Sequence, residues 1–309
     1  IVYGVVGASG LFINDITAMI ISRAFLGIGV AAISIPLIVL ILNVYKAEEC
    51  NKIMGWQASA TSIGGIIWPL LGGALGVMAW NLPFGIYLAG IPIGFLAWLT
   101  IPDTANKKAV AMKEDTASVL QTMKKNPVIL AIYSLGLWMM VLLYTNVTFI
   151  PQLLAGTFGI TNSLFISSFI AAGGIAAAIS AFNYKKTKSK FSYNAIAIIG
   201  LSLWTVGFIL LSQTISIIIV IVAFVLFGIG QGMVMPTLNL WVGELTNTCT
   251  RGRMISYLTT FLFIGQFLPP IIFNPIFSAL SFAGVFLITG IICAIMAALF
   301  LINLKRKAK

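Results

Sequence analysis

The chain has 309 residues, of which 60% are hydrophobic and only 8% are charged, and its mean hydropathy is +1.07. A soluble domain carries about 25% charged residues, so this composition excludes an ordinary soluble protein. The net charge of +11 does not favour nucleic-acid binding, because the basic residues lie beside the ends of apolar segments, where they set membrane topology and meet anionic lipid head groups. Histidine is absent and the three cysteines form no CxxC pair, so we expect no metal, no cofactor and no enzymatic centre.

Ten apolar segments follow one another along the chain, and most reach the ~20 residues that a membrane-crossing helix needs. We predict that all are helices, since a single chain with this pattern cannot otherwise satisfy its backbone in lipid. The first segment would be about 20 Å long, shorter than the roughly 30 Å hydrocarbon core, and we interpret it as a span that begins upstream of Ile1. The segments are 1–13, 16–43, 54–79, 82–101, 128–154, 163–182, 193–212, 215–241, 255–278 and 281–303.

The basic residues alternate from one gap to the next. Seventeen of the eighteen Lys and Arg lie in four polar gaps and the C-terminal tail, and the gaps between these carry none. Because Lys and Arg accumulate in short cytoplasmic loops, this pattern predicts a multi-pass protein of the cell membrane (inner or plasma) with a cytoplasmic C-terminus. The long gap 103–126 is expected to be a cytoplasmic central loop, either with a short helix on the membrane surface or as a flexible linker.

Short matches indicate an internal repeat. Phe25 to Gly29 is echoed by Leu226 to Gly230, the pair Gly65 and Pro69 by Gly265 and Pro269, and Gly85 to Leu88 by Gly284 to Leu287. The offset stays close to 200 residues and equivalent loops keep the same sidedness, so the two halves are parallel. We therefore predict an all-α membrane protein with two pseudo-symmetric bundles, 1–102 and 127–309, the first of which lacks two spans and the start of a third. Parallel halves of this kind occur in the major facilitator architecture, where the substrate site lies near the midplane.

Arg23 is the only charged residue well inside an apolar segment. Placing Arg at a helix centre costs about 2.5–3.5 kcal/mol on insertion scales, so we predict a functional role in a central cavity. The alternative is that the side chain snorkels toward the outer turn. No acid lies deep in any segment, because Asp15 is at the outer turn and Glu244 is at a helix end. We expect its partner to be absent, a substrate, or on spans upstream of Ile1.

Two segments carry motif-like patterns, which in isolation are also explained by ordinary helix packing. The third segment contains Gly55-x8-Gly64-x3-Trp68-Pro69-x2-Gly72-Gly73, and the second contains Met19-x3-Arg23-x3-Gly27-x-Gly29. The first pattern resembles the antiporter signature on the fifth span of drug/proton antiporters of the major facilitator superfamily, except that Trp68 stands where Gly is usual. The second resembles the fourth-span signature of that family, with Leu26 where Gln is frequent.

The resemblance covers essentially the whole chain, as spans three to twelve of a twelve-span protein. It implies that Arg23 handles protons, and that the Gly/Pro residues of the third segment form a bend and a seal that favour export. Other small residues and one proline are expected to serve helix packing: Gly4, Gly7, Gly10, Gly27, Gly29, Gly228, Gly230, Gly265 and Pro269.

Several polar and aromatic residues lie on segments that would line a central cavity. They suit a large, mostly apolar pocket with a few hydrogen-bonding groups, although each alone is better explained by a contact between helices. As a set they favour neutral or lipophilic cationic substrates, because a multiply charged anion would need several buried cations. The candidates are Gln57, Trp138, Tyr144, Asn146, Gln231, Asn239, Tyr257 and Gln266.

These patterns together predict a secondary transporter that exports a small, lipophilic, drug-like molecule by proton antiport through alternating access, an activity of the multidrug-resistance kind. We expect a monomer in the lipid bilayer whose partners are the substrate and protons. The first alternative is a sugar or metabolite exporter or facilitator of the same superfamily. The second is a membrane scaffold that transports nothing.

Overall fold

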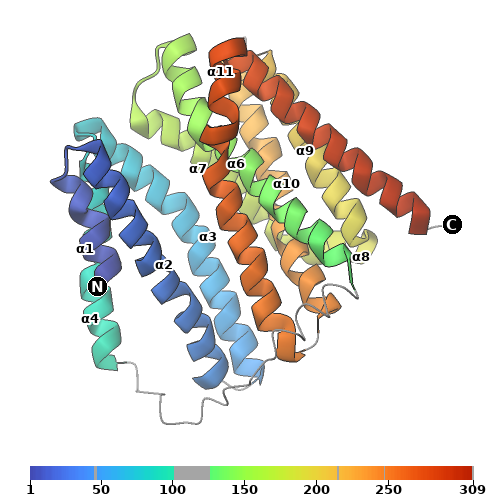
Figure 1. The fold of residues 1–309 in the computed structure, drawn as a ribbon, viewed down its shortest axis with the longest axis horizontal. Coiled ribbons are helices and arrows are strands. Elements are labelled where there is room, and N and C mark those ends of the chain that lie inside the picture. Colours follow the sequence, from blue (N-terminus) through green and yellow to red (C-terminus); the bar gives the residue numbers. More distant parts are fainter. Residues whose placement is uncertain (45–46, 101–125, 214–215, 247, 308–309) are drawn as a thin grey trace. The chain divides into compact units, whose positions relative to one another are not determined.

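The computed structural model describes residues 1–44, 47–100, 126–213, 216–246 and 248–307, and every regular element in these ranges is a helix (Figure 1). Seven of the described helical stretches are long and apolar enough to cross a membrane. The elements are α1 (Val2–Ala8), η1 (Ser9–Leu11), α2 (Ile16–Val44), α3 (Ala47–Met78), η2 (Leu82–Ala89), α4 (Gly90–Thr100), α6 (Val128–Phe158), α7 (Ser163–Phe182), α8 (Tyr184–Lys190), α9 (Tyr193–Ser212), α10 (Ile217–Leu245) and α11 (Thr248–Lys307).

The helices follow the predicted apolar segments. The last two predicted segments, 255–278 and 281–303, both lie in α11, which Ser281 divides with a φ of 58° and a ψ of −168°. A positive φ is uncommon for a residue other than glycine, and here it lets the chain reverse between the two parts of α11, as Figure 1 shows. The predicted central loop 103–126 lies outside the described residues, except for Asn126.

Polar residues at the turns cap three of the helices. The Asp15 carboxylate accepts a 2.7 Å hydrogen bond from the backbone N–H of Ala18 at the start of α2. Asn162 does the same for Phe165 in α7, and Ser192 caps α9. Such caps satisfy the first N–H groups of a helix, which have no partner within it. The Asp15 carboxylate therefore serves the end of its own helix.

The described chain divides into two compact units. The first holds α1 to α4 and the start of α7, and the second holds α6, the rest of α7 and α8 to α11. This grouping divides α7 between Ala171 and Ala172, whereas the predicted bundles 1–102 and 127–309 assign all of α7 to the second bundle.

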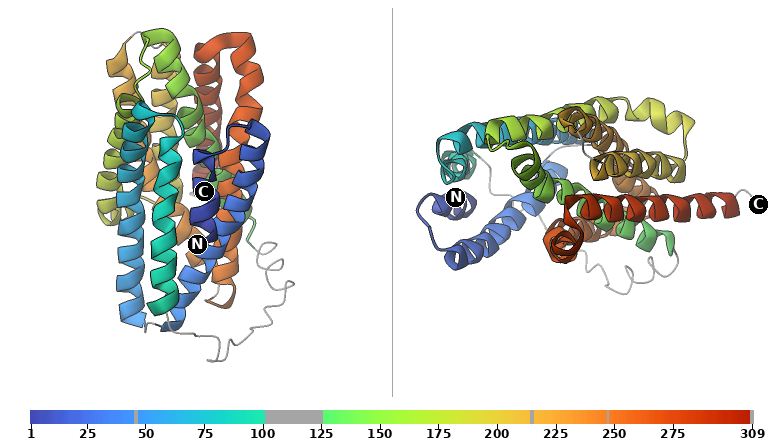
Figure 2. Two further views of the ribbon diagram at one scale, coloured as in Figure 1. Left: turned by 90° about the vertical axis from the view of Figure 1, so that its left-hand side faces the viewer. Right: turned by 90° about the horizontal axis from the view of Figure 1, so that it is seen from above.

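The second unit has a well-packed core. In it α11 lies against both α6 and α9, and α9 lies against α10, so these helices run side by side in Figure 2. An aromatic cluster fills the space between α9, α10 and α11. The Phe208 ring lies 4.6 Å from the Phe227 ring and 6.4 Å from the Phe286 ring, measured between centroids. The indole N–H of Trp204 donates to the backbone carbonyl of Phe227 at 2.9 Å, so this buried polar group has a partner.

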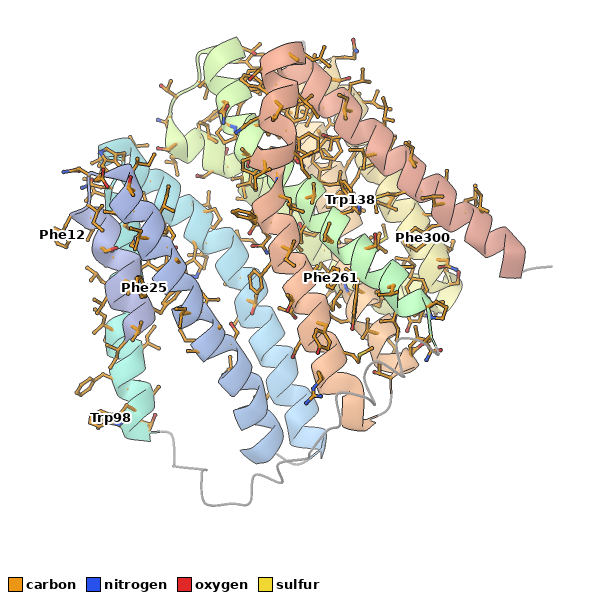
Figure 3. All side chains as sticks on the ribbon, viewed as in Figure 1. Phe12, Phe25, Trp98, Trp138, Phe261 and Phe300 are labelled. Carbon is orange, nitrogen blue, oxygen red and sulfur yellow. The ribbon has the colours of Figure 1, made fainter. Side chains whose placement is uncertain are left out.

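The first unit exposes much of its apolar surface. In it α1 packs against η2 and α2, and α3 packs against η2. Phe12 and Trp98 are 83% and 73% exposed and lie at the outer edge of these helices in Figure 3. Large apolar side chains exposed in such numbers are expected where the surrounding solvent is lipid hydrocarbon. The helices and this surface describe a multi-pass membrane protein.

Candidate functional site

Arg23 lies two turns into α2, and its contacts within the first unit come from a carbonyl group and two aromatic rings. One guanidinium nitrogen, Nη2, donates to the backbone carbonyl of Gly7 at 3.4 Å. The guanidinium carbon lies 4.8 Å from the centre of the Phe84 ring and 6.0 Å from the centre of the Tyr87 ring. Nε is buried and has no hydrogen-bond partner among the described residues. The side chain is therefore half-buried, and its buried Nε is an unused donor among the described residues.

The Gly/Pro stretch of α3 combines a proline with an unusual tryptophan. Pro69 lies inside the helix, where it removes one backbone donor and favours a bend. A Cβ added at Gly64 would lie 3.1 Å from the indole nitrogen of Trp68, so the indole folds back over Gly64, while 52% of Trp68 stays exposed. At this position the glycine makes room for a side chain of its own helix.

The remaining glycines of the two motifs differ in their surroundings. Gly73 is buried, and a Cβ there would overlap Ser167 at the start of α7, within the same unit. Gly72 and Gly27 have open space beside them in the described part of the chain, since a Cβ at either would meet nothing there within 4 Å. Gly55 lies in α3, but its surroundings are outside the described part of the structure. Only Gly73 of these four is therefore seen to allow a close approach.

The glycines predicted to serve packing mostly lie in tight contacts. A Cβ at Gly29 would lie 3.2 Å from the Cα of Tyr3 on α1. In the second unit, Cβ atoms at Gly228, Gly230 and Gly265 would overlap, in turn, the Gly173 carbonyl, the Trp204 indole and the Leu137 carbonyl. Pro269 lies inside α11.

The candidate cavity residues gather mainly on two helices that pack together, α6 and α11. Figure 3 labels Trp138 of α6 and Phe261 of α11 in this part of the second unit. The Gln266 amide lies 3.8 Å from the Met140 sulfur. The members differ in exposure: Asn146 is buried, Trp138, Tyr144, Gln231 and Gln266 are half-buried, Asn239 and Tyr257 are exposed, and the side chain of Gln57 lies outside the described set.

Asn146 is the candidate with unsatisfied polar atoms. Its side chain is only 2% exposed, and neither its amide nitrogen nor its amide oxygen has a hydrogen-bond partner among the residues that the structure describes. It lies on the buried face of α6, one turn from Leu142 and Phe149, which are both fully buried. An unpaired buried amide costs about 1–3 kcal/mol, so an apolar residue would be the more stable choice at this position. By contrast, the Asn239 amide bonds to the Met235 carbonyl of its own helix.

Sequence reasoning did not identify two groups of residues. The first is the pair of rings under Arg23. The second lies where α8, α9 and α10 meet. The Tyr193 hydroxyl donates to the Glu244 carboxylate. The Tyr193 ring also stacks on the Trp241 indole, and the Lys188 amine lies 3.9 Å from the ring centre. The only sequence signal for this second group was an acid at a helix end beside a basic gap.

Nearby, Tyr184 of α8 links that short helix to α10. The Tyr184 hydroxyl and the Thr237 hydroxyl are 2.9 Å apart, and burial raises the pKa of Tyr184 above its ordinary value. The hydroxyl pair therefore joins α8 to α10.

Comparison with known families decides the fold. The sequence matches the family model described as Major Facilitator Superfamily over residues 1–270 and over residues 189–309. The chain belongs to this superfamily. The prediction of an all-α membrane protein with the major facilitator fold is thereby confirmed, and the family is one of transporters.

Solved structures of superfamily members have the same fold. A bacterial homologue of the human lysosomal transporter Spinster, inward-facing and unoccupied, aligns with a TM-score of 0.77 at 14% identity, covering 97% of this chain and 80% of that one. A D-xylose-proton symporter aligns with a TM-score of 0.72 at 13% identity, over 94% and 78% of the two chains. The nucleoside transporter NupG (D323A mutant) aligns with a TM-score of 0.65 at 14% identity, over 97% and 82%. No curated protein sequence matches the chain.

Proposed function

We propose that the protein is a secondary active transporter that exports a small lipophilic organic molecule across the cell inner membrane in exchange for protons. The observation that carries the proposal is Arg23, a cation within an apolar helix whose donors are only partly used. The sequences around Arg23 in α2 and around Pro69 in α3 resemble the signatures of drug/proton antiporters, which supports export over import. The basic loops and tail support a cytoplasmic C-terminus.

The guanidinium supplies the electrostatic part of the mechanism. An arginine side chain stays cationic in a protein, so it favours the ionised form of any carboxylate that approaches it. A proton exchanger needs an acid that releases its proton on one side of the membrane and regains it on the other. Arg23 would set the proton affinity of such an acid, while the two halves of the fold expose the site alternately to each side.

The α3 helix supplies the structural part. Pro69 weakens the backbone ladder, and the open space beside Gly72 leaves room for the helix to change its path. The next residue, Gly73, lies in close contact with Ser167 of α7. A helix that bends at one point and seals at the next suits a transporter that must close one side while it opens the other.

The proposal predicts substrate uptake driven by a pH gradient. Proteoliposomes that are one pH unit more acidic inside should accumulate a lipophilic cation about tenfold for a one-for-one exchange without a membrane potential, since one pH unit is worth a factor of ten. A fluorescent lipophilic dye measures the uptake, and a protonophore should abolish it. Uptake that is unchanged by the protonophore would indicate a facilitator. The absence of flux for every tested solute would indicate a scaffold.

A second candidate function is export of a sugar or other hydrogen-bonding metabolite, and Asn146 favours it. The unpaired buried amide offers one donor group and one acceptor to a polar ligand. A site that keeps such a group at a cost in stability is typical of function rather than of packing.

Replacing Asn146 with Leu separates the two candidates. The substitution should raise the thermal unfolding temperature, because it removes a buried unpaired amide. If the substrate bonds to Asn146, its KM should also rise roughly five- to tenfold, the worth of one hydrogen bond. Thr145→Val is the matched control, because the Thr145 hydroxyl is buried but bonds to Val141 of its own helix. A higher unfolding temperature with unchanged KM for every polar solute would contradict the metabolite function.

A further inference from the structure

The contacts of Arg23 come from residues on the neighbouring elements α1 and η2. The guanidinium carbon lies 4.8 Å from the centre of the Phe84 ring. It lies 6.0 Å from the centre of the Tyr87 ring, which is close to the limit for a cation–π interaction. Both rings belong to η2. Among the described residues, the one hydrogen-bond partner of this guanidinium is the carbonyl of Gly7 on α1. At 3.4 Å it is longer than the usual N–H···O bond, so the rings carry much of the attraction.

Glycines on α1 and η1 make room for these rings. Gly4, Gly7 and Gly10 recur every third residue and face η2 and α4. A Cβ at Gly10 would lie 2.6 Å from the Phe84 ring, and a Cβ at Gly7 would overlap the Tyr87 ring. Any other residue at these two positions would therefore displace the rings. The Tyr87 ring is held on another side by the Tyr3 ring, 5.2 Å away between centroids.

Rings and carboxylates hold an arginine in different ways. A carboxylate pairs with the guanidinium edge and uses up two N–H donors. An aromatic ring attracts the face of the guanidinium and leaves its edge donors free. The buried Nε without a partner is consistent with the second arrangement.

We propose that Phe84 and Tyr87 are positioning residues for Arg23, and that Gly7 and Gly10 seat their rings. The rings fix the place of the cation while its donors stay available to a carboxylate or a substrate group. Without them the long side chain would regain its rotamer freedom and turn toward the aqueous edge of the membrane. The positioning role rests on the proposed proton-coupling function of Arg23. The contact of the guanidinium with the two rings does not depend on that function.

Arginine NMR tests the contact without any transport assay. The sequence has four arginines, so protein labelled with ¹⁵N-arginine in lipid nanodiscs gives few Nε–H signals, and Arg23→Lys identifies the one from Arg23. Ring currents shift nuclei that lie over an aromatic face. Phe84→Leu and Tyr87→Leu should therefore each move the Arg23 signal and leave the other arginine signals unchanged. Gly7→Ala should move it too, because the added methyl group displaces the Tyr87 ring.

Two matched controls should leave the signal in place. Phe25→Leu removes a ring from the same helix as Arg23, but this ring is 56% exposed. Gly85→Ala adds a methyl group next to Phe84 in the sequence, where it meets only Leu11 at an ordinary 3.8 Å. If these controls move the signal as much as Phe84→Leu does, the shift reports a general disturbance and the proposal is wrong.

The transport assay tests positioning. Phe84→Leu should lower proton-driven transport roughly fivefold, the effect of one cation–π contact, and should shift its pH profile, whereas Phe84→Tyr keeps a ring and should restore both. An Arg23 signal unmoved by Phe84→Leu and Tyr87→Leu in folded protein overturns the proposal. If the signal moves but Arg23→Ala transports with a normal pH profile, the rings do hold Arg23 and the proton-coupling function is what fails.

Discussion

Replacing Arg23 with Ala should abolish proton-driven efflux while the protein still folds and inserts. A cation within a few ångströms lowers the pKa of a carboxylate by about 1–3 units, so its loss weakens proton release roughly ten- to thousandfold. Insertion should not suffer, because the change removes a charge from an apolar helix. Efflux driven by a pH gradient in proteoliposomes measures the first effect, and the yield of folded protein in detergent measures the second.

Arg23→Lys is the informative companion to that variant. Lysine keeps the charge but loses the planar guanidinium, which both the Gly7 carbonyl and the Phe84 ring contact. We expect partial activity with a displaced pH profile. Normal efflux with a normal pH dependence in Arg23→Ala would show that this side chain does not couple protons to transport.

The helices were predictable because a helix that crosses lipid must be apolar along its length, and such segments stand out in the sequence. Their ends were less so: α3 begins at Ala47 and includes Glu48 and Glu49, whereas the predicted segment begins at residue 54. Likewise α6 extends to Phe158 and α10 to Leu245, beyond the predicted ends at 154 and 241. A helix satisfies its own backbone in water as well as in lipid, so it continues past the apolar stretch. Hydropathy therefore measures the lipid-facing length of a helix and not its full length.

The candidate site was predictable only in part. Arg23 stands out in the sequence because it is a lone charge in an apolar segment. Its contacts with Phe84 and Tyr87 do not, because these rings lie on a distant part of the chain and aromatic residues are common in membrane helices. Polarity also fails to separate Asn146, which is buried and unpaired, from Asn239, which is exposed and bonded to its own helix. Which side a residue faces depends on the helices packed around it.

The repeat offers a sharp test of that dependence. Gly65 of α3 and Gly265 of α11 are equivalent in sequence, each four residues before a proline. A Cβ at Gly265 would overlap the backbone carbonyl of Leu137 and lie 2.9 Å from the Cβ of Met140, both on α6. A Cβ at Gly65 would meet none of the described atoms within 4 Å. We therefore expect Gly265→Ala to be strongly destabilising and Gly65→Ala to be neutral or slightly stabilising, since Ala is the better helix former.

The cost at Gly265 follows from what the methyl group would meet. A side chain in the way can rotate, but a backbone carbonyl cannot, so α6 and α11 must move apart and lose contacts along their length. Overpacking of this kind costs about 1–3 kcal/mol, which lowers the unfolding temperature by on the order of 5 °C. Cys293 is fully buried, so a thiol-reactive dye reports unfolding when Cys50 and Cys249 are replaced by Ser.

The pair of variants tests whether two glycines related by the internal repeat also share the same packing. Equal unfolding temperatures for Gly265→Ala and the unsubstituted protein would mean that the approach of α6 to α11 does not depend on this glycine. An equal loss at Gly65 would mean that a neighbour contacts that face of α3 in the membrane as closely as Leu137 contacts α11. The expected difference instead requires that two residues related by the repeat now serve different surroundings, one at a helix contact and the other beside open space.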